Sequence, residues 1–193
     1  MKRYILFTVY CLLFTALAAQ GLSEQKIIQK MTIAAESIKT VQCNFTQTKR
    51  MKMLSKEHVS QGKMFCQQPD KLRWEYTSPR SSTLILDGTN VRLLKGDSDN
   101  GGRNKFMGEM ARLIMNSVAG KCLTDSKAFQ VSAKELPTEY IATLLPLKKE
   151  MKRLYTKLVL HFDTKQSTVT KVELHEKNGD QTIIDLHDIQ INK

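Results

Sequence analysis

The first clear pattern along the chain is helical. Between residues 23 and 39, apolar side chains recur at spacings of three and four, and charged residues fall outside this face. A period close to 3.6 residues is the signature of an amphipathic helix. We therefore expect a helix that packs one face on a core, with its apolar positions at Ile27, Ile28, Met31, Ala34, Ala35 and Ile38.

The period then changes to two, which is typical of half-buried strands. Val41, Cys43 and Phe45 alternate with polar residues, and residues 48–56 form a basic stretch expected at the exposed end of a hairpin. Asn178-Gly179 is a strong hairpin signal between the last two predicted strands. The remaining strands are expected at residues 58–68, 72–76, 83–87, 91–94, 129–132, 139–145, 154–162, 168–176 and 181–191.

A second helical pattern interrupts the strands at residues 103–120. Its apolar stripe is broad, and Gly120 is a typical C-terminal stop. The order of elements predicts an α+β fold, mainly antiparallel β, in which a curved sheet is wrapped by two helices. If the helices cover its concave face loosely, the space between is an apolar cavity. The stripe consists of Phe106, Met107, Met110, Leu113, Ile114 and Val118.

The first twenty residues have a different character. Two basic residues precede an apolar run at 4–17, and small residues occupy the −3 and −1 positions of a cleavage site before Ala19. This pattern is typical of a secretory signal peptide and is too short for a membrane-spanning helix of about 20 apolar residues. We expect residues 1–18 to be a cleaved signal peptide and 19–193 a single domain. The alternative is a buried N-terminal strand or helix.

Composition and charge narrow the class of protein. The 193 residues are 41% hydrophobic and 25% charged, close to the globular average, which excludes a collagenous or wholly disordered chain. The formal net charge of +11 suggests an anionic partner. Two of these charges belong to the predicted signal peptide, and export argues against nucleic acid as that partner.

The basic residues cluster at 49–56 and at 148–157. A solvated surface accounts for most of them. The functional alternative is attraction to anionic lipid headgroups, worth roughly 1 kcal/mol per basic residue near a membrane.

Three cysteines follow the predicted signal peptide, and an odd number does not suit a disulfide framework. Cys43 and Cys66 fall on the two arms of one predicted hairpin and would face each other if its turn centred near Leu54 and Ser55. A disulfide between them is compatible with the sequence, but two buried free thiols are the favoured interpretation.

Catalytic and metal-binding patterns are missing from the sequence. The four histidines are scattered, and alternation places His161, His175 and His187 on the outward side of their strands. There is no GxSxG, HExxH, P-loop or CxxC motif. We therefore expect neither an enzyme nor a cofactor or metal site.

The chain contains an ordered set of motifs: FTQTK at 45–49, GKMF at 62–65 and PDKLRWEY at 69–76, followed by the Asp87-Gly88 turn, the Met-rich helical insert and the strand at 158–162. This ordered set resembles the LolA-type periplasmic lipoprotein carrier family, in particular its Bacteroidetes-like branch. The similarity covers essentially the whole mature chain. It implies a half-open curved β-barrel with a helical lid that encloses an apolar cavity.

The resemblance also implies a function. Family members are periplasmic carriers that shield the acyl chains of triacylated lipoproteins between an inner-membrane exporter and an outer-membrane acceptor, and we expect a monomer that touches membrane surfaces transiently. The candidate cavity and lid residues are Phe45, Leu72, Tyr76, Phe106, Met107, Met110, Leu113 and Ile114. Core packing is an equal alternative for the methionines of the insert, which include Met115, and it is the favoured role of Trp74.

Two positions depart from the family pattern. Leu72 stands where the family has a phenylalanine that contacts the exporter, so it is the exporter-contact candidate. Gln68 stands where the best-studied branch has an arginine that helps to hold the lid. The chain also stops at Lys193, earlier than relatives would suggest. Two other functions stay open: a related cavity protein for another amphiphile such as a glycolipid, and a ligand-free envelope scaffold or adaptor.

Overall fold

One large antiparallel sheet organises the molecule. The computed structural model describes residues 22–54, 56–95, 98–99 and 105–193, so the predicted signal peptide lies outside the described residues. The sheet has 11 strands in the order β6-β5-β4-β3-β2-β1-β11-β10-β9-β8-β7. The first and last long strands of the chain pair with each other, and Phe45 lies opposite Leu186. This pairing joins the two halves of the sheet.

The strands are β1 (Thr40–Arg50), β2 (His58–Gln67), β3 (Lys71–Ser78), β4 (Ser82–Asp87), β5 (Asn90–Lys95), β6 (Ser98–Asp99), β7 (Phe129–Glu135), β8 (Glu139–Pro146), β9 (Tyr155–Asp163), β10 (Val169–Glu176) and β11 (Gln181–Ile191). The helices are α2 (Glu24–Ser37), α3 (Lys105–Val118), the 3₁₀ turn η1 (Lys121–Leu123) and α4 (Lys149–Leu154).

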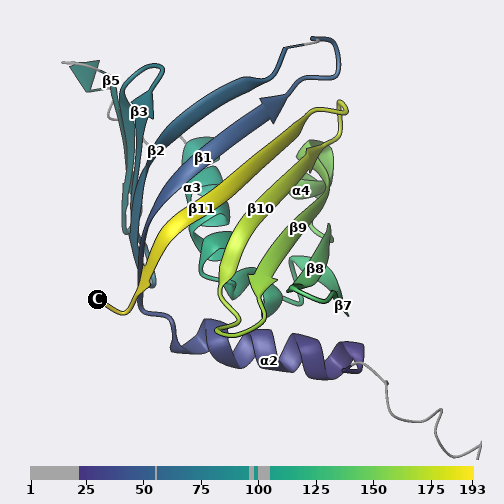
Figure 1. Ribbon diagram of the computed structural model, residues 1–193. Coiled ribbons are helices and arrows are strands. Elements are labelled where there is room, and N and C mark those ends of the chain that lie inside the picture. Colours follow the sequence, from purple (N-terminus) through teal and green to yellow (C-terminus); the bar gives the residue numbers. More distant parts are fainter. Residues whose placement is uncertain (1–21, 55, 96–97, 100–104) are drawn as a thin grey trace, which may run out of the picture.

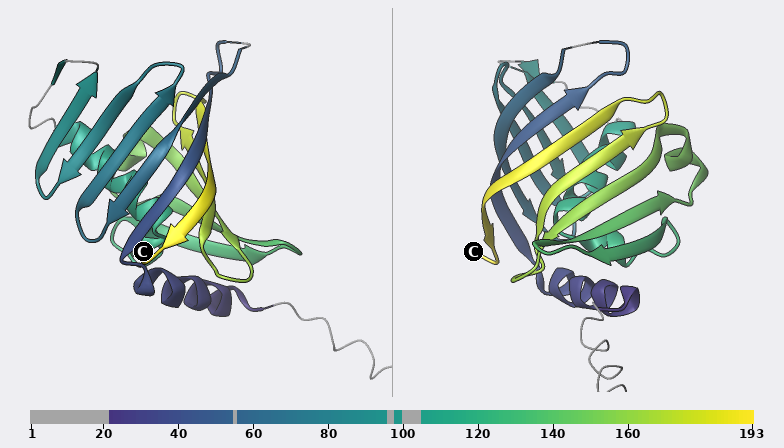
Figure 2. Two further views of the ribbon diagram at one scale, coloured as in Figure 1. Left: turned by 60° about the vertical axis from the view of Figure 1, so that its left-hand side comes forward. Right: turned by 45° about the vertical axis from the view of Figure 1, so that its right-hand side comes forward.

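The sheet is strongly curved but open. Its described edges, β6 and β7, stand at opposite ends of the strand order and do not pair. Figures 1 and 2 show α3 lying inside the curve and α2 lying across one end of the sheet. This is the half-open, helix-covered sheet that the sequence predicts.

The concave face holds the core because alternate side chains of each strand point to it. Phe45 stacks on Trp74 with ring centroids 3.9 Å apart. Gly62 makes this stack possible, since a Cβ there would lie 2.5 Å from the Phe45 ring and 2.0 Å from the carbonyl oxygen of Glu75. The largest fully buried side chains include Trp74, Phe45, Phe162, Met64, Leu72, Leu86, Met115, Leu144, Leu158 and Leu160.

The two predicted helices are present. In α2 the residues Ile27, Met31 and Ala35 are buried, and the helix packs on β7 and η1. α3 ends at Val118, and Gly120 adopts a positive φ of 70° as the predicted stop. A Cβ on Gly120 would lie 3.0 Å from Cβ of Ala35, so this glycine also admits the close approach of α2. Within the described residues, no helix is long and apolar enough to cross a bilayer.

Some local features differ from the sequence expectations. The short helix α4 and the two-residue strand β6 were not predicted, and β1 runs on to Arg50 into the stretch expected as the hairpin end. The hairpin register is also offset, because Cys43 lies opposite Met64, and Cys66 lies opposite Val41. The two cysteines therefore do not face each other directly.

The described cysteines are buried free thiols, as favoured from the sequence. Burial raises the pKa of Cys43 to about 12 and that of Cys66 to about 11. Because the thiolate is the reactive form, both groups are inert at neutral pH. They act as small apolar side chains of the core.

His161 is on the outer face of β9, as alternation predicts, yet it is hardly solvated. Its side chain is 12% exposed because Glu139 of β8 and Glu173 of β10 lie on either side of it. The two ring nitrogens are 2.8 Å and 3.1 Å from these carboxylates. Neighbouring strands thus bury a residue that the sequence alone places in solvent.

Candidate lipid-binding site

A hollow of about 320 Å³ lies between α3 and the concave face of the sheet. An apolar cavity of about 150 Å³ already holds a benzene ring, so this space is large enough for a segment of an alkyl chain. It is lined by Gln47, Lys49, Tyr76, Met110, Ile114, Leu154, Tyr155, Leu174, Glu176, Thr182 and Ile184.

The wall of the hollow is apolar on both sides. Met110 and Ile114 lie four residues apart on α3 and therefore share one face of the helix. Leu174 of β10 and Ile184 of β11 belong to the inward face of the sheet. The flexible thioether of methionine adapts to irregular partners, so this wall suits a ligand that has no fixed shape.

The entrance of the hollow is polar. Lys49 Nζ lies 3.1 Å from Glu176 Oε1, and the hydroxyl of Thr182 donates to the same oxygen at 3.3 Å. The side chains of Lys49 and Glu176 are 37% and 22% exposed, which places them at the rim and not on the floor. Lys49, Thr182 and Glu176 bond to one another, so these bonds stay intact when an apolar ligand enters the hollow.

Two tyrosines separate the polar entrance from the apolar wall. Burial, assisted by the charge of Glu176, raises the pKa of Tyr155 to about 12. Burial also raises the pKa of Tyr76. Both hydroxyls are therefore neutral donors at physiological pH: Tyr155 donates to the sulfur of Met110 at 3.1 Å, and Tyr76 donates to Gln47 Oε1 at 3.0 Å.

Arg112 ties α3 to the strands. Its guanidinium donates to the backbone oxygen of Gly88, in the turn between β4 and β5. Among the described contacts, Gln68 makes none with α3. Its backbone N–H donates to the carbonyl of Lys39 at 2.8 Å, and its buried Nε2 has no partner among the described residues. The family pattern places the lid-holding arginine at the position of Gln68, and the sequence analysis named no replacement for it. Arg112 was missed because it gives no signal beyond its place on the polar side of the helix.

The structure separates the predicted cavity residues into groups. Tyr76, Met110 and Ile114 line the hollow. Phe45 and Leu72 are 1% and 2% exposed and lie in the core beneath it.

Other members of the predicted set lie elsewhere. Leu113 faces a second hollow on the other side of α3. Met115 and Trp74 are each 1% exposed and belong to the core. Phe106 and Met107 belong to α3, but their side chains lie outside the described part of the molecule.

Several lining residues were not singled out from the sequence. Gln47 and Lys49 follow Phe45 at intervals of two and so share its inward face; Thr182 and Ile184 share the face of Leu186 in the same way. Extending the alternation along β1 and β11 would have found all four. Leu154 and Tyr155 are placed by α4, which the sequence analysis missed.

The other hollows suit an alkyl chain less well. The space behind α3 has about 360 Å³ and mixes the apolar Leu113 and Phe129 with six charged residues, Glu109, Arg112, Lys121, Asp125, Lys148 and Glu150.

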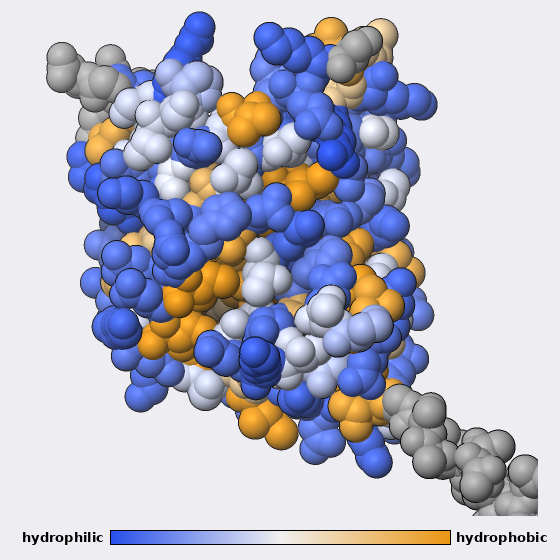
Figure 3. Space-filling view, viewed as in Figure 1, coloured by the Kyte–Doolittle hydropathy of each residue, from blue (hydrophilic) through white to orange (hydrophobic). Residues whose placement is uncertain are grey.

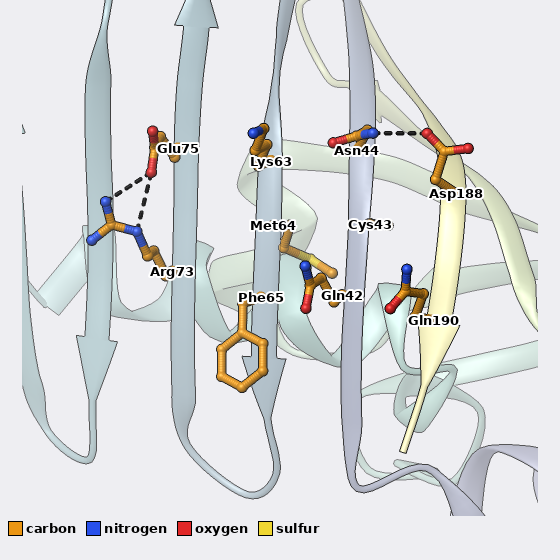
Figure 4. Close-up of a pocket in the computed structure, with 10 residues that line it drawn as sticks. All are labelled: Gln42, Cys43, Asn44, Lys63, Met64, Phe65, Arg73, Glu75, Asp188 and Gln190. Atoms are coloured by element: carbon orange, nitrogen blue, oxygen red, sulfur yellow. Dashed lines mark hydrogen bonds and ion pairs between the residues drawn. The ribbon is translucent and has the colours of Figure 1, made fainter. Parts of the chain in front are cut away.

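A groove on the outer face of β1, β2, β3 and β11 is also polar (Figure 4). Arg73 pairs there with Glu75 at 2.7 Å, and Asn44 donates to Asp188 at 2.8 Å. Phe65, 38% exposed, is the large apolar side chain on its surface. The hollow under α3 is therefore the best candidate for lipid.

Comparison with known proteins agrees with this architecture. The family model described as outer membrane lipoprotein carrier protein LolA matches residues 36–193. The chain belongs to the LolA family. An outer-membrane lipoprotein carrier protein of Pseudomonas fluorescens (strain Pf0-1) is 25% identical over 191 residues, 99% of this chain and 90% of that protein. One from Pseudomonas putida (strain GB-1) is 23% identical over 166 residues, 86% of this chain and 78% of that protein.

A solved structure shares the LolA fold. The crystal structure of MucB superimposes with a TM-score of 0.50 at 10% identity, covering 88% of this chain and 59% of the MucB chain. At that identity the likeness concerns the fold alone.

LolA membership defines the class of activity. The protein is an outer-membrane lipoprotein carrier protein, distantly related to the Pseudomonas carriers, and its family is periplasmic and non-enzymatic. The family and the outer-membrane lipoprotein carrier function implied by the sequence motifs are thus confirmed. The exporter and the acceptor stay predictions. The branch within the family stays a prediction.

Proposed function

We propose that this LolA protein carries its lipoprotein cargo with acyl chains in the hollow between α3 and the sheet. The observation that supports this most is the pairing of an adaptable apolar wall, Met110 and Ile114, with Leu174 and Ile184 across an open space. Each buried methylene contributes roughly 0.8 kcal/mol, so even part of one chain binds usefully.

Loading requires α3 to move. About 320 Å³ is a small volume for the acyl chains of a triacylated lipoprotein. We therefore propose that α3 swings away from the sheet and exposes the apolar core beneath it. Two described polar contacts that must break in this motion are those of Arg112 with the carbonyl of Gly88 and of Tyr155 with Met110. Acyl chains then replace the side chains of α3 against the sheet. The net binding free energy is therefore small, which permits release of the cargo.

The route of the cargo is part of the proposal. Residues 1–18 are cleaved as a signal peptide, residues 19–193 act as one domain, and cargo passes from an inner-membrane exporter to an outer-membrane acceptor. Leu72 is 2% exposed. A contact between Leu72 and the exporter therefore needs the open form, in which α3 no longer covers the core.

Photo-cross-linking tests where the cargo binds. A photoreactive amino acid replaces Ile114 in one variant and Leu145 in another; Leu145 is a matched apolar position that is 42% exposed on β8. We expect cross-links to acylated lipoprotein from position 114 and none from position 145. Equal cross-linking from both would contradict the proposed site, and mass spectrometry of the product distinguishes a lipoprotein from a glycolipid.

A further inference from the structure

Two basic segments that are far apart in the sequence meet at one end of the molecule. Residues 49–57 hold four basic and one acidic residue, and residues 148–157 hold five basic and one acidic residue. Figures 1 and 2 place the β1–β2 tip, the β10–β11 turn and α4 together at the end opposite α2. α2 itself has two basic and two acidic residues and so, unlike the two basic segments, carries no net charge.

Hydrogen bonds join these three segments into a continuous edge. The backbone N–H of Lys52 donates to Asp180 Oδ1 at 3.0 Å, which links the β1–β2 tip to the β10–β11 turn. The backbone N–H of Lys177 donates to the carbonyl of Leu154 at 2.8 Å, which links that turn to α4. We call residues 49–54, 56–57, 148–157 and 176–180 the basic rim.

The entrance of the hollow opens within the basic rim. The ion pair between Lys49 and Glu176 lies at that entrance, and both residues belong to the rim. Leu154 and Tyr155, also in the rim, line the hollow from its other side. Whatever surface the rim contacts is therefore also the surface that the hollow faces.

The β1–β2 tip adds exposed apolar side chains to this charge. Met53 is 95% exposed and Leu54 is 53% exposed. The turn itself is held, since the N–H of Leu54 donates to the carbonyl of Met51 at 2.9 Å. In Figure 3 hydrophobic atoms emerge among hydrophilic ones at the tip of this hairpin. Two adjacent apolar side chains on a projecting turn form a wedge and not a pocket.

Most charges of the rim are available to a partner. Arg50 pairs with Glu57, and Lys148 lies 3.9 Å from Asp125. In the described part of the chain, Lys56, Lys152 and Arg153 have no ion pair. An apolar wedge surrounded by unpaired cations matches an anionic lipid surface, which offers headgroup phosphates outside and hydrocarbon just beneath.

We propose that the basic rim docks on an anionic bilayer, with Met53 and Leu54 inserted among the lipids. A bilayer fits better than a protein partner. A stable protein interface needs roughly 1,000 Å² of well-packed surface, whereas two projecting apolar side chains can insert into a fluid lipid surface. Docking turns the entrance of the hollow toward the membrane. That consequence for acyl transfer rests on the proposed function, but docking itself does not.

Vesicle binding without cargo tests the proposal. The protein is recovered from the periplasm of expressing cells, so that its N-terminus is as the cell leaves it. It is floated with vesicles of phosphatidylethanolamine and phosphatidylglycerol, or of phosphatidylcholine alone. We expect binding to the anionic vesicles only, weakened by salt. Removal of each basic residue should weaken vesicle binding by about fivefold. Replacement of a basic residue by an acidic one should weaken it further.

Variants at the two ends of the molecule are compared directly. Met53→Asp with Leu54→Asp removes the wedge, and Lys152→Glu with Arg153→Glu reverses charge on the rim. The controls at the opposite end are Ile33→Asp, whose parent side chain is 60% exposed on α2, and Lys26→Glu with Lys165→Glu. We expect loss of vesicle binding in the first two variants and none in the Ile33 control. The Lys26 and Lys165 control loses much less than the rim variant.

The outcomes separate this proposal from the carrier mechanism. Failure of the wild type to bind anionic vesicles, or equal losses at both ends, overturns docking even if acyl chains still cross-link at position 114. If the protein binds native membranes and protease treatment of those membranes abolishes the binding, the partner of the rim is a protein. That result would also overturn docking on lipid. If vesicles bind but position 114 captures no acyl chain, docking stands and the proposed acyl site fails.

Discussion

The hydroxyl of Tyr155 donates a hydrogen bond to the sulfur of Met110 at 3.1 Å, where α3 meets the hollow. This contact joins the first residue of β9 to the side chain that lines the hollow from α3. A neutral phenol and a thioether form a weak bond that is easily exchanged for contact with an acyl chain. Arg112, by contrast, adds a hydrogen bond from a charged group to the apolar packing of α3.

Met110→Asp should abolish loading, because acyl chains would then bury an unpaired charge. We expect affinity for an acyl probe to fall about a hundredfold, equivalent to roughly 3 kcal/mol. Fluorescence titration with a labelled fatty acid measures it. Met110→Leu is the matched control and should bind almost as the wild type does, since it conserves volume and apolarity. Equal binding by the two variants would exclude Met110 from the site.

Arg112→Ala should loosen α3 without unfolding the sheet. A hydrogen bond from a charged group contributes about 1.5–3 kcal/mol, and this bond joins the helix to the turn at Gly88. Hydrogen exchange followed by mass spectrometry should show faster exchange in α3 and unchanged exchange in the β1–β11 pair. Gln68→Ala is the comparison, because its side chain makes no hydrogen bond to the described residues of α3. Acceleration of α3 by Gln68→Ala alone would mean that the lid is held differently.

Acid should remove a contribution that Glu173 makes to stability. Burial by itself would raise the pKa of Glu173, but hydrogen bonds and charges from His175 and His161 outweigh it and lower that pKa below its ordinary value of 4.5. A folded-state pKa below the unfolded one gives stability that is fully present at higher pH. It is lost as pH falls through the folded value.

Urea unfolding of the wild type and Glu173→Gln measures this effect. The wild type should be more stable than the variant at neutral pH, and the difference should shrink below about pH 4.5. His187, which approaches Thr46 and no carboxylate among the described contacts, supplies the control variant His187→Gln, whose difference from wild type should not shrink in the same way. A difference for Glu173→Gln that grows in acid would reverse the assigned direction.

The sequence predicted much of the fold because local patterns determine it. The 3.6-residue period placed α2 and α3, alternation placed the inward faces of β1 and β9 to β11, and Gly120 marked the helix stop. The hairpin register was missed, since it depends on where the turn closes and not on alternation, which is unchanged by a shift of two residues.

The candidate site was only partly predicted, for a physical reason. Periodicity tells which residues of α3 are apolar but not which of them line the hollow under α3, line the second hollow or belong to the core. Met110, Leu113 and Met115 occupy these three places respectively. Arg112 was missed because its partner is a backbone carbonyl, which no side-chain pattern reveals.

The central claim is that acyl chains occupy the space between α3 and the sheet. The most direct measurement uses a lipoprotein whose acyl chain ends in a nitroxide, together with NMR of methyl groups in the carrier. We expect strong paramagnetic broadening of the Met110 and Ile114 methyl signals in the complex, and little effect on Ile33, which lies exposed on α2. Tight binding that leaves Met110 and Ile114 sharp would contradict the account.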